Sequence, residues 1–275
     1  MFRIFRRARE SSLLERKFTR FVSYAMGEIF LVVVGILIAL QINNWNEERI
    51  ERNEIREYAL NLSAAIERDM EMLGPVEMQI RASIRQAEEL ARYLRDHRVE
   101  EIDNAELFFL TTHIGYRPYG WNRAALAQLK ASGGLRKMES QLLVQRISDY
   151  DALTLHLDQD YREDEESARA LKDMINQLVD LNYDRQGLDD VLEWWDGFTP
   201  EDIDRRLLEF RETKEFSNLA SLGRSPLSEN PEDFRRLANL NIEYAEDTNA
   251  RPNIELPRLR RFAAEIQELI DTEYR

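Results

Sequence analysis

Residues 21–42 read FVSYAMGEIFLVVVGILIALQI, and this stretch decides the fold. Its densest part, Ile29–Leu40, contains no charged residue. An α-helix rises about 1.5 Å per residue, so the stretch would span roughly 33 Å, which is enough to cross a bilayer core of about 30 Å. Tyr24 near one end and Trp45 beyond the other suit the aromatic belts of a membrane helix. The sequence therefore predicts a transmembrane helix over residues 21–43.

A soluble core helix and a cleavable signal peptide are the two alternative interpretations of this stretch. The core helix of a soluble protein could carry a similar apolar run, although it would not need the full length. A cleavable signal peptide needs small residues at a cleavage site after the apolar run, and the residues that follow, Leu40–Asn44, offer none. The pattern favours an uncleaved signal-anchor.

The charges that flank the stretch predict its orientation. Residues 1–20 contain seven Lys or Arg and two Glu, whereas the segment after the span mixes Arg with Glu. Positive residues are retained on the cytoplasmic side of a membrane. We therefore expect a basic cytoplasmic tail over residues 1–20 and an acidic domain over residues 44–275 outside the cytoplasm. In a bacterium this would be an inner-membrane protein with a periplasmic domain.

The span and its border also resemble a known family. The segment Gly27–Glu47, GEIFLVVVGILIALQINNWNE, resembles the hallmark of DUF6090, a bacterial family of unknown function made of small single-span membrane proteins. The segment Leu129–Leu135, LKASGGL, is similar to a Leu-Lys-Ser-Ser-Gly stretch of the same family. The family has no established activity, so the resemblance implies architecture and membrane placement only.

One face of the predicted span carries its small and polar residues. On a helical projection Glu28, Gly35 and Ala39 share a stripe, which includes the only carboxylate of the span. Helices in lipid associate through close packing at small residues and through polar contacts. The stripe predicts an interface with a second copy or with another membrane protein. Glu28 could instead extend to the lipid headgroups beside Lys17 or Arg20, or line an ion pathway.

Beyond Trp45 the apolar residues recur at helical spacing almost throughout. The pattern predicts that the span continues as one helix to Leu73, where Gly74–Pro75 would end it. Asn249–Asn253 is expected to form a linker. Further helices are expected at 76–95, 105–113, 123–131, 137–160, 163–183 (fused with the preceding helix or separate), after Thr199, at 234–245 and at 256–274. The predicted fold is all-α, with one N-terminal transmembrane helix that continues into an extracytoplasmic helical bundle.

Composition and motifs exclude most kinds of chemistry. The chain has no Cys, and its net charge of −14 disfavours a nucleic-acid partner. His97, His113 and His156 lie far apart in sequence and in no metal-binding motif, so no metal site is expected. No phosphate-binding glycine loop or nucleophile elbow occurs. We therefore expect no catalytic residue, no cofactor and no enzymatic activity. The acidic run Asp158–Glu166 is interpreted as a solvated helix face.

Two aromatic clusters stand out from this background. They are candidates for a partner or ligand patch, because Trp, Tyr and Arg dominate binding hot spots. The alternative, which the sequence favours, is that their rings cover the ends of the bundle core. The clusters consist of Tyr116, Arg117, Tyr119 and Trp121, and of Trp194, Trp195 and Phe198.

These observations predict a non-enzymatic single-pass membrane protein that acts as an oligomerising scaffold or interaction module. Its expected partners are the lipid bilayer and either further copies of itself or another membrane protein. A periplasmic ligand sensor that works through a membrane partner is the main alternative. A pore-forming oligomer, suggested by Glu28 alone, is a weaker one.

Overall fold

The computed structural model describes residues 2–111, 114–180, 182, 209 and 211–274, and only the backbone of residues 2–25, 215 and 219. Within these ranges every regular element is a helix. The predicted all-α fold, with a long apolar N-terminal helix followed by further helices, is confirmed. The chain divides into two units, Met1–Glu57 and Tyr58–Arg275.

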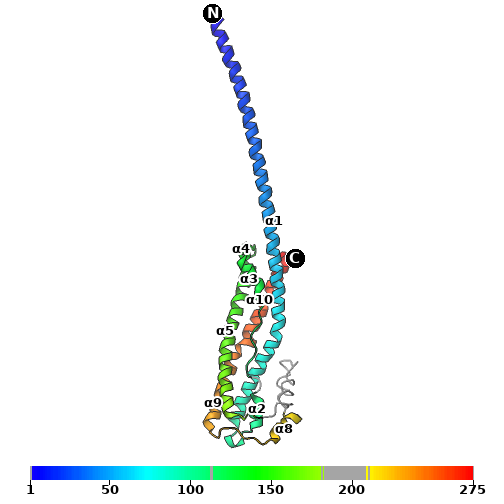
Figure 1. The fold of residues 1–275 in the computed structure, drawn as a ribbon, viewed down its shortest axis with the longest axis vertical. Coiled ribbons are helices and arrows are strands. Elements are labelled where there is room, and N and C mark those ends of the chain that lie inside the picture. The colour runs from blue at the N-terminus through cyan, green and yellow to red at the C-terminus, as the bar shows by residue number, and fades with distance from the viewer. Residues whose placement is uncertain (1, 112–113, 181, 183–208, 210, 275) are drawn as a thin grey trace. The chain divides into compact units, whose positions relative to one another are not determined.

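The longest element is α1, which runs from Phe2 to Asp96 (Figure 1). The prediction that Gly74–Pro75 ends this helix is wrong, because Pro75 lies inside α1. Proline removes one backbone hydrogen bond, but Leu73 and Val76 on either side are both 2% exposed. Their burial in the second unit keeps the chain helical, and α1 changes direction in its cyan part (Figure 1).

In the apolar stretch of α1, every described side chain except that of Val34 is exposed. Phe30 is 67% exposed and Leu31 is 71% exposed. Length and composition allow α1 to cross a membrane, and none of its apolar window is buried within the chain. A core helix of a soluble protein would be mostly buried, so the structure does not support that interpretation.

The remaining elements belong to the second unit. They are the 3₁₀-helix η1 (Val99–Glu101), α2 (Asn104–Leu110), α3 (Arg123–Ala131), α4 (Gly134–Lys137), α5 (Gln141–Leu178), α8 (Lys214–Ser221), α9 (Pro231–Thr248), the π-helical turn η2 (Arg251–Glu255) and α10 (Leu256–Tyr274).

Two of the predicted helices, α2 and α9, begin where a local side chain caps the first turn. The Asp103 side chain accepts a hydrogen bond from the backbone N–H of Ala105 at the start of α2. The Asn230 side chain likewise accepts from Glu232 at the start of α9. The helices predicted at 137–160 and 163–183 are one helix, α5, and the helix predicted to start after Thr199 lies outside the described residues.

The expected linker at Asn249–Asn253 is instead a widened helical turn. The backbone at Asn249 and Ala250 is helical, and the N–H of Leu256 bonds to the carbonyl of Arg251, five residues back. Pro252 has no N–H to donate, and its ring would clash with the carbonyl four residues earlier, which accounts for a π-turn here. The chain thus stays helical from α9 through η2 into α10.

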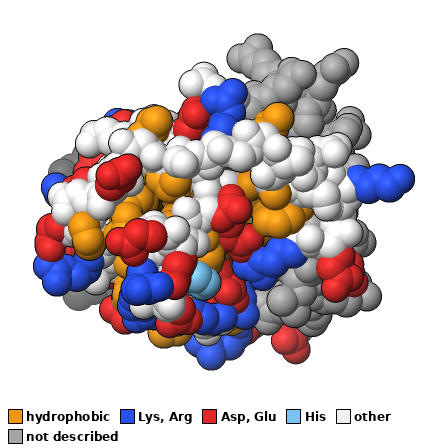
Figure 2. Space-filling model, turned by 90° about the horizontal axis from the view of Figure 1, so that it is seen from below, with side chains coloured by type: hydrophobic (Ala, Val, Ile, Leu, Met, Phe, Trp, Pro, Cys, Tyr) orange, Lys and Arg blue, Asp and Glu red, His pale blue; other side chains and the backbone are white. Residues whose placement is uncertain are grey.

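In the second unit α5 packs along α9, η2 and α10, and α2 packs on α8. The part of α1 in this unit joins them through buried side chains such as Leu62, Ile66 and Ile80. Large apolar side chains from α2 and α9, including Phe109 and Phe234, fill the same core. On the face shown in Figure 2, acidic and basic side chains are interspersed with small apolar areas.

Candidate functional site: a buried charge network at the π-turn

The acidic run on α5 is not a uniformly solvated face. Asp160 is 5% exposed and Asp164 is 4% exposed, whereas Glu163, Glu165 and Glu166 are exposed. The two aspartates lie four residues apart, on the same helix face as the core residues of α5. The interpretation of a solvated face is therefore wrong for Asp160 and Asp164, whose carboxylates are buried at core-facing positions of α5.

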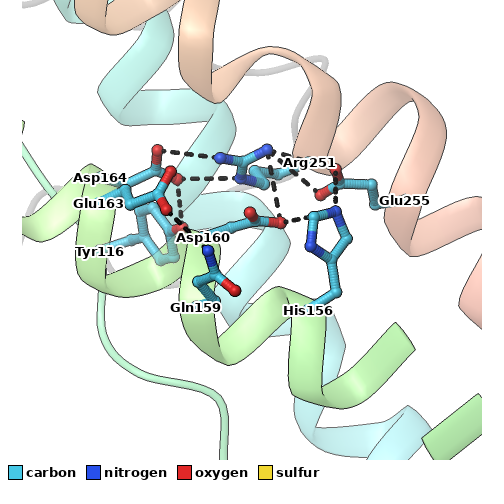
Figure 3. A network of polar contacts seen from close by, with 8 residues as sticks. All are labelled: Tyr116, His156, Gln159, Asp160, Glu163, Asp164, Arg251 and Glu255. Atoms are coloured by element: carbon cyan, nitrogen blue, oxygen red, sulfur yellow. Dashed lines mark hydrogen bonds and ion pairs between the residues drawn. The ribbon is translucent and has the colours of Figure 1, made fainter. Parts of the chain in front are cut away.

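Arg251, the first residue of the π-turn, faces both aspartates (Figure 3). Its Nε lies 3.1 Å from Oδ2 of Asp164, and its Nη2 lies 3.3 Å from Oδ1 of the same carboxylate. Its Nη1 lies 3.6 Å from Oδ2 of Asp160 and donates to Glu255 Oε1 at 3.3 Å. Arg251 is 8% exposed, so these charges interact in a largely dehydrated place.

His156 completes the network on its solvent side. Its Nε2 lies 3.4 Å from Oδ2 of Asp160 and 3.6 Å from Oε1 of Glu255 (Figure 3). The His156 side chain is 54% exposed, whereas the Glu255 side chain is 13% exposed. One imidazole and two carboxylates thus meet at the boundary between the buried network and solvent.

Burial and charge shift the pKa values in the network in different directions. Burial raises the pKa of Asp164, although Tyr116 and Arg251 act against this rise. Burial also raises the pKa of Glu255, and Arg251 again opposes it. Burial lowers the pKa of Arg251, but the surrounding carboxylates raise it by more, so the guanidinium stays charged.

The aromatic loop between α2 and α3 packs against the same part of α5. The hydroxyl of Tyr116 donates to Asp164 Oδ2 at 2.6 Å, and Tyr119, which is 8% exposed, stacks on Trp121. The indole N–H of Trp121 donates to Asp158 at 2.8 Å. The loop therefore covers the middle of α5 and supplies hydrogen-bond donors to its aspartates.

The buried carboxylate of Asp69 binds the end of this loop. Asp69 on α1 accepts hydrogen bonds from the backbone N–H of Asn122 at 2.7 Å and from the hydroxyl of Tyr150 at 2.8 Å. Close to the start of the loop, Ser83 accepts from the backbone N–H of Gly115. Polar side chains on α1 thus hold both ends of the aromatic loop.

Four further predicted site residues, Glu28, Gly35, Ala39 and Arg117, lie among the fully described residues and make none of the contacts of this network. Glu28, Gly35 and Ala39 are exposed on α1. Arg117 is exposed, in contrast to the three rings beside it. The second aromatic cluster, Trp194, Trp195 and Phe198, lies outside the described residues.

Residues 28–119 match the model of a family of unknown function, DUF6090. The resemblance to DUF6090 is thereby confirmed over these residues, about a third of the chain. The matched segment contains residues 28–42 of the apolar stretch of α1 and ends within the aromatic loop at Tyr119, so Leu129–Leu135 lies beyond it. No match to the chain was found among curated proteins or among solved structures.

Sequence reasoning missed the network because its members come from distant segments. Only α5 carried a signal: Asp160 and Asp164 continue the helical spacing of the buried residues Leu153 and Leu157. Charged residues at core positions of an amphipathic helix indicate a buried partner. Nothing near Arg251 in the sequence pointed to that partner.

Proposed function

We propose that this protein is a non-enzymatic single-span membrane protein whose helical domain acts outside the cytoplasm as a scaffold or interaction module. The observation that carries the proposal is the apolar stretch of α1, in which all described side chains but Val34 are exposed and none is buried against another described residue. Such a surface is stable in lipid and would aggregate in water. The DUF6090 match covers residues 28–42 of this stretch.

The orientation in this proposal rests on charge. The basic segment 1–20 remains in the cytoplasm, and residues 44–275 lie on the opposite side, which is the periplasm in a bacterial inner membrane. The excess of acidic residues disfavours nucleic acid as a partner. The partners are the bilayer and a second membrane helix, either from another copy or from a different protein.

Association of the span is proposed to use the stripe of Glu28, Gly35 and Ala39. A Cβ atom added at Gly35 would meet nothing within 4 Å, so the chain itself leaves this position open to a neighbour. Small residues allow two helix backbones to approach closely in lipid, where apolar burial gives no driving force.

Cysteine crosslinking in membranes tests this association directly, because the natural chain contains no Cys. We expect Gly35→Cys and Ala39→Cys chains to form disulfide-linked dimers when membranes are oxidised. Val33→Cys and Leu37→Cys are matched controls on other faces of the same helix, and we expect them to remain largely monomeric. Crosslinking that is equal at all four positions, or absent from all four, would contradict an interface between copies of this chain at the stripe.

A further inference from the structure

Three donor side chains meet where the π-turn faces α5. His156 and Asp160 lie one helical turn apart on α5, and Glu255 is the last residue of η2. One donor atom from each lies within 4.8 Å of the other two. Figure 3 shows the imidazole and the two carboxylates pointing toward one another. Two helices distant in sequence thus supply a single cluster of one nitrogen and two oxygen donors.

The spacing of the donors fits the coordination shell of a small cation. Zinc binds imidazole nitrogen and carboxylate oxygen at about 2.0–2.2 Å, so adjacent donors of a tetrahedral site lie about 3.3–3.5 Å apart. The His156 Nε2 lies 3.4 Å from Asp160 Oδ2 and 3.6 Å from Glu255 Oε1. The oxygens of Asp160 and Glu255 lie within 4.8 Å of each other, so closure around an ion draws these two carboxylates together.

The charge balance of the network also points to a cation. Asp160, Asp164 and Glu255 contribute three carboxylates, and Arg251 contributes one guanidinium, which makes its shortest contact in the network with Asp164. The excess of two negative charges equals the charge of a divalent ion. Buried charge without compensation is strongly unfavourable.

The side chain of Asp160 supports a cation site independently of the charge balance. Its side chain is buried, and its Oδ2 has no hydrogen-bond partner within the described structure, although His156 and Arg251 lie at ion-pair distance. A buried carboxylate oxygen is normally hydrogen-bonded or metal-bound. This oxygen faces the donors of His156 and Glu255.

We propose that His156, Asp160 and Glu255 bind a divalent transition-metal ion of the Zn²⁺ type. An imidazole with two carboxylates suits zinc and its neighbours, whereas Mg²⁺ and Ca²⁺ prefer shells made of oxygen alone. The exposed edge of His156 leaves room for water to complete the shell. Arg251 contacts both carboxylates and orients them. The site adds a ligand to the proposed scaffold role. A bound metal ion would connect α5 to the π-turn, because its ligands come from both elements.

Calorimetric titration of the full-length chain in detergent with ZnCl₂ at neutral pH tests this site. The protein should carry no polyhistidine tag and should first be stripped with EDTA. We expect one Zn²⁺ per chain, a higher melting temperature with Zn²⁺ bound, and no equivalent binding of MgCl₂ or CaCl₂. The ligand variants His156→Ala and Glu255→Gln should weaken Zn²⁺ binding by at least about 10–100-fold, because even residues that only support metal ligands cost that much.

His97→Ala is the matched control, since His97 is also an exposed histidine but contacts Tyr93, outside the network. The His156→Ala substitution alters an exposed ring, and circular dichroism will verify that the chain stays helical. Unchanged Zn²⁺ affinity in His156→Ala would overturn the site. The absence of Zn²⁺ binding to the natural chain, or an equal loss of affinity in His97→Ala, would also overturn it.

Discussion

Asp69 shows how single polar residues shape this bundle. Its carboxylate is 5% exposed and accepts hydrogen bonds from Asn122 and Tyr150, and burial raises its pKa against the effect of these two donors. A raised pKa means that the folded chain binds the Asp69 proton more tightly than the unfolded chain does. The stabilising contribution of that proton is complete below the unfolded pKa of about 4 and disappears as pH rises through the higher folded value.

The Asp69→Asn substitution should remove this pH dependence. Asparagine resembles the protonated carboxyl group, so we expect the natural chain to gain free energy of unfolding relative to Asp69→Asn when pH falls from 7 toward 4. Urea denaturation of the two full-length chains at several pH values measures this difference. Asp173→Asn, at an exposed position of α5, is the control. A difference between the natural and Asp69→Asn chains that stays constant with pH would contradict the assignment.

At the level of single residues, the sequence indicates which side chains are candidates for contacts, but not which residues they contact. The grouping of Tyr116, Tyr119 and Trp121 was visible because these residues are neighbours in one loop. Their packing against Asp158 and Asp164 was not, because it depends on how α5 lies beside the loop. A charged side chain looks solvated in a sequence until its helix face is known to be buried.

At the scale of elements, capping side chains can be identified from the sequence, whereas the effect of Pro75 and of Pro252 on the backbone cannot. Asp103 and Asn230 cap the helices that follow them through contacts two residues away, so a sequence pattern suffices to find them. Pro75 and Pro252 lie within helical backbone because the helix is anchored in the second unit near each of them, by Leu73 and Val76 in one case and by Thr248 and Leu256 in the other. Whether a proline ends or widens a helix depends on how the residues near it pack against segments that are distant in sequence.

The turn between α3 and α4 offers a test of an element boundary. Gly133 has a φ of +71°, and a Cβ atom added at Gly134 would lie 2.6 Å from Cδ1 of the buried Leu129. We expect Gly134→Ala to lower the free energy of unfolding by about 1–3 kcal/mol through overpacking. Gly120→Ala, where nothing lies within 4 Å of the added atom, should change it by less than about 0.5 kcal/mol. Equal effects of the two substitutions in urea denaturation would show that the turn is not tightly packed.

At the scale of the whole molecule the all-α fold and the long apolar helix followed from hydrophobic periodicity alone. The close packing of α5 with α9 and α10 did not, because antiparallel and parallel pairings of amphipathic helices share the same sequence pattern. The charge network at the π-turn is a consequence of that pairing. The orientation of the span is predicted from the charges that flank it. Its association with a second helix is predicted from the small residues on one face.

Alkaline carbonate extraction of cell membranes that contain the full-length chain tests whether α1 anchors the protein in lipid. The account predicts that the natural chain stays in the membrane pellet, because the apolar stretch of α1 is buried in lipid. A Val33→Arg, Leu37→Arg chain should move to the soluble fraction, since each Arg near the centre of a membrane helix costs about 2.5–3.5 kcal/mol. Recovery of the natural chain in the carbonate supernatant would contradict the membrane anchor and the account built on it.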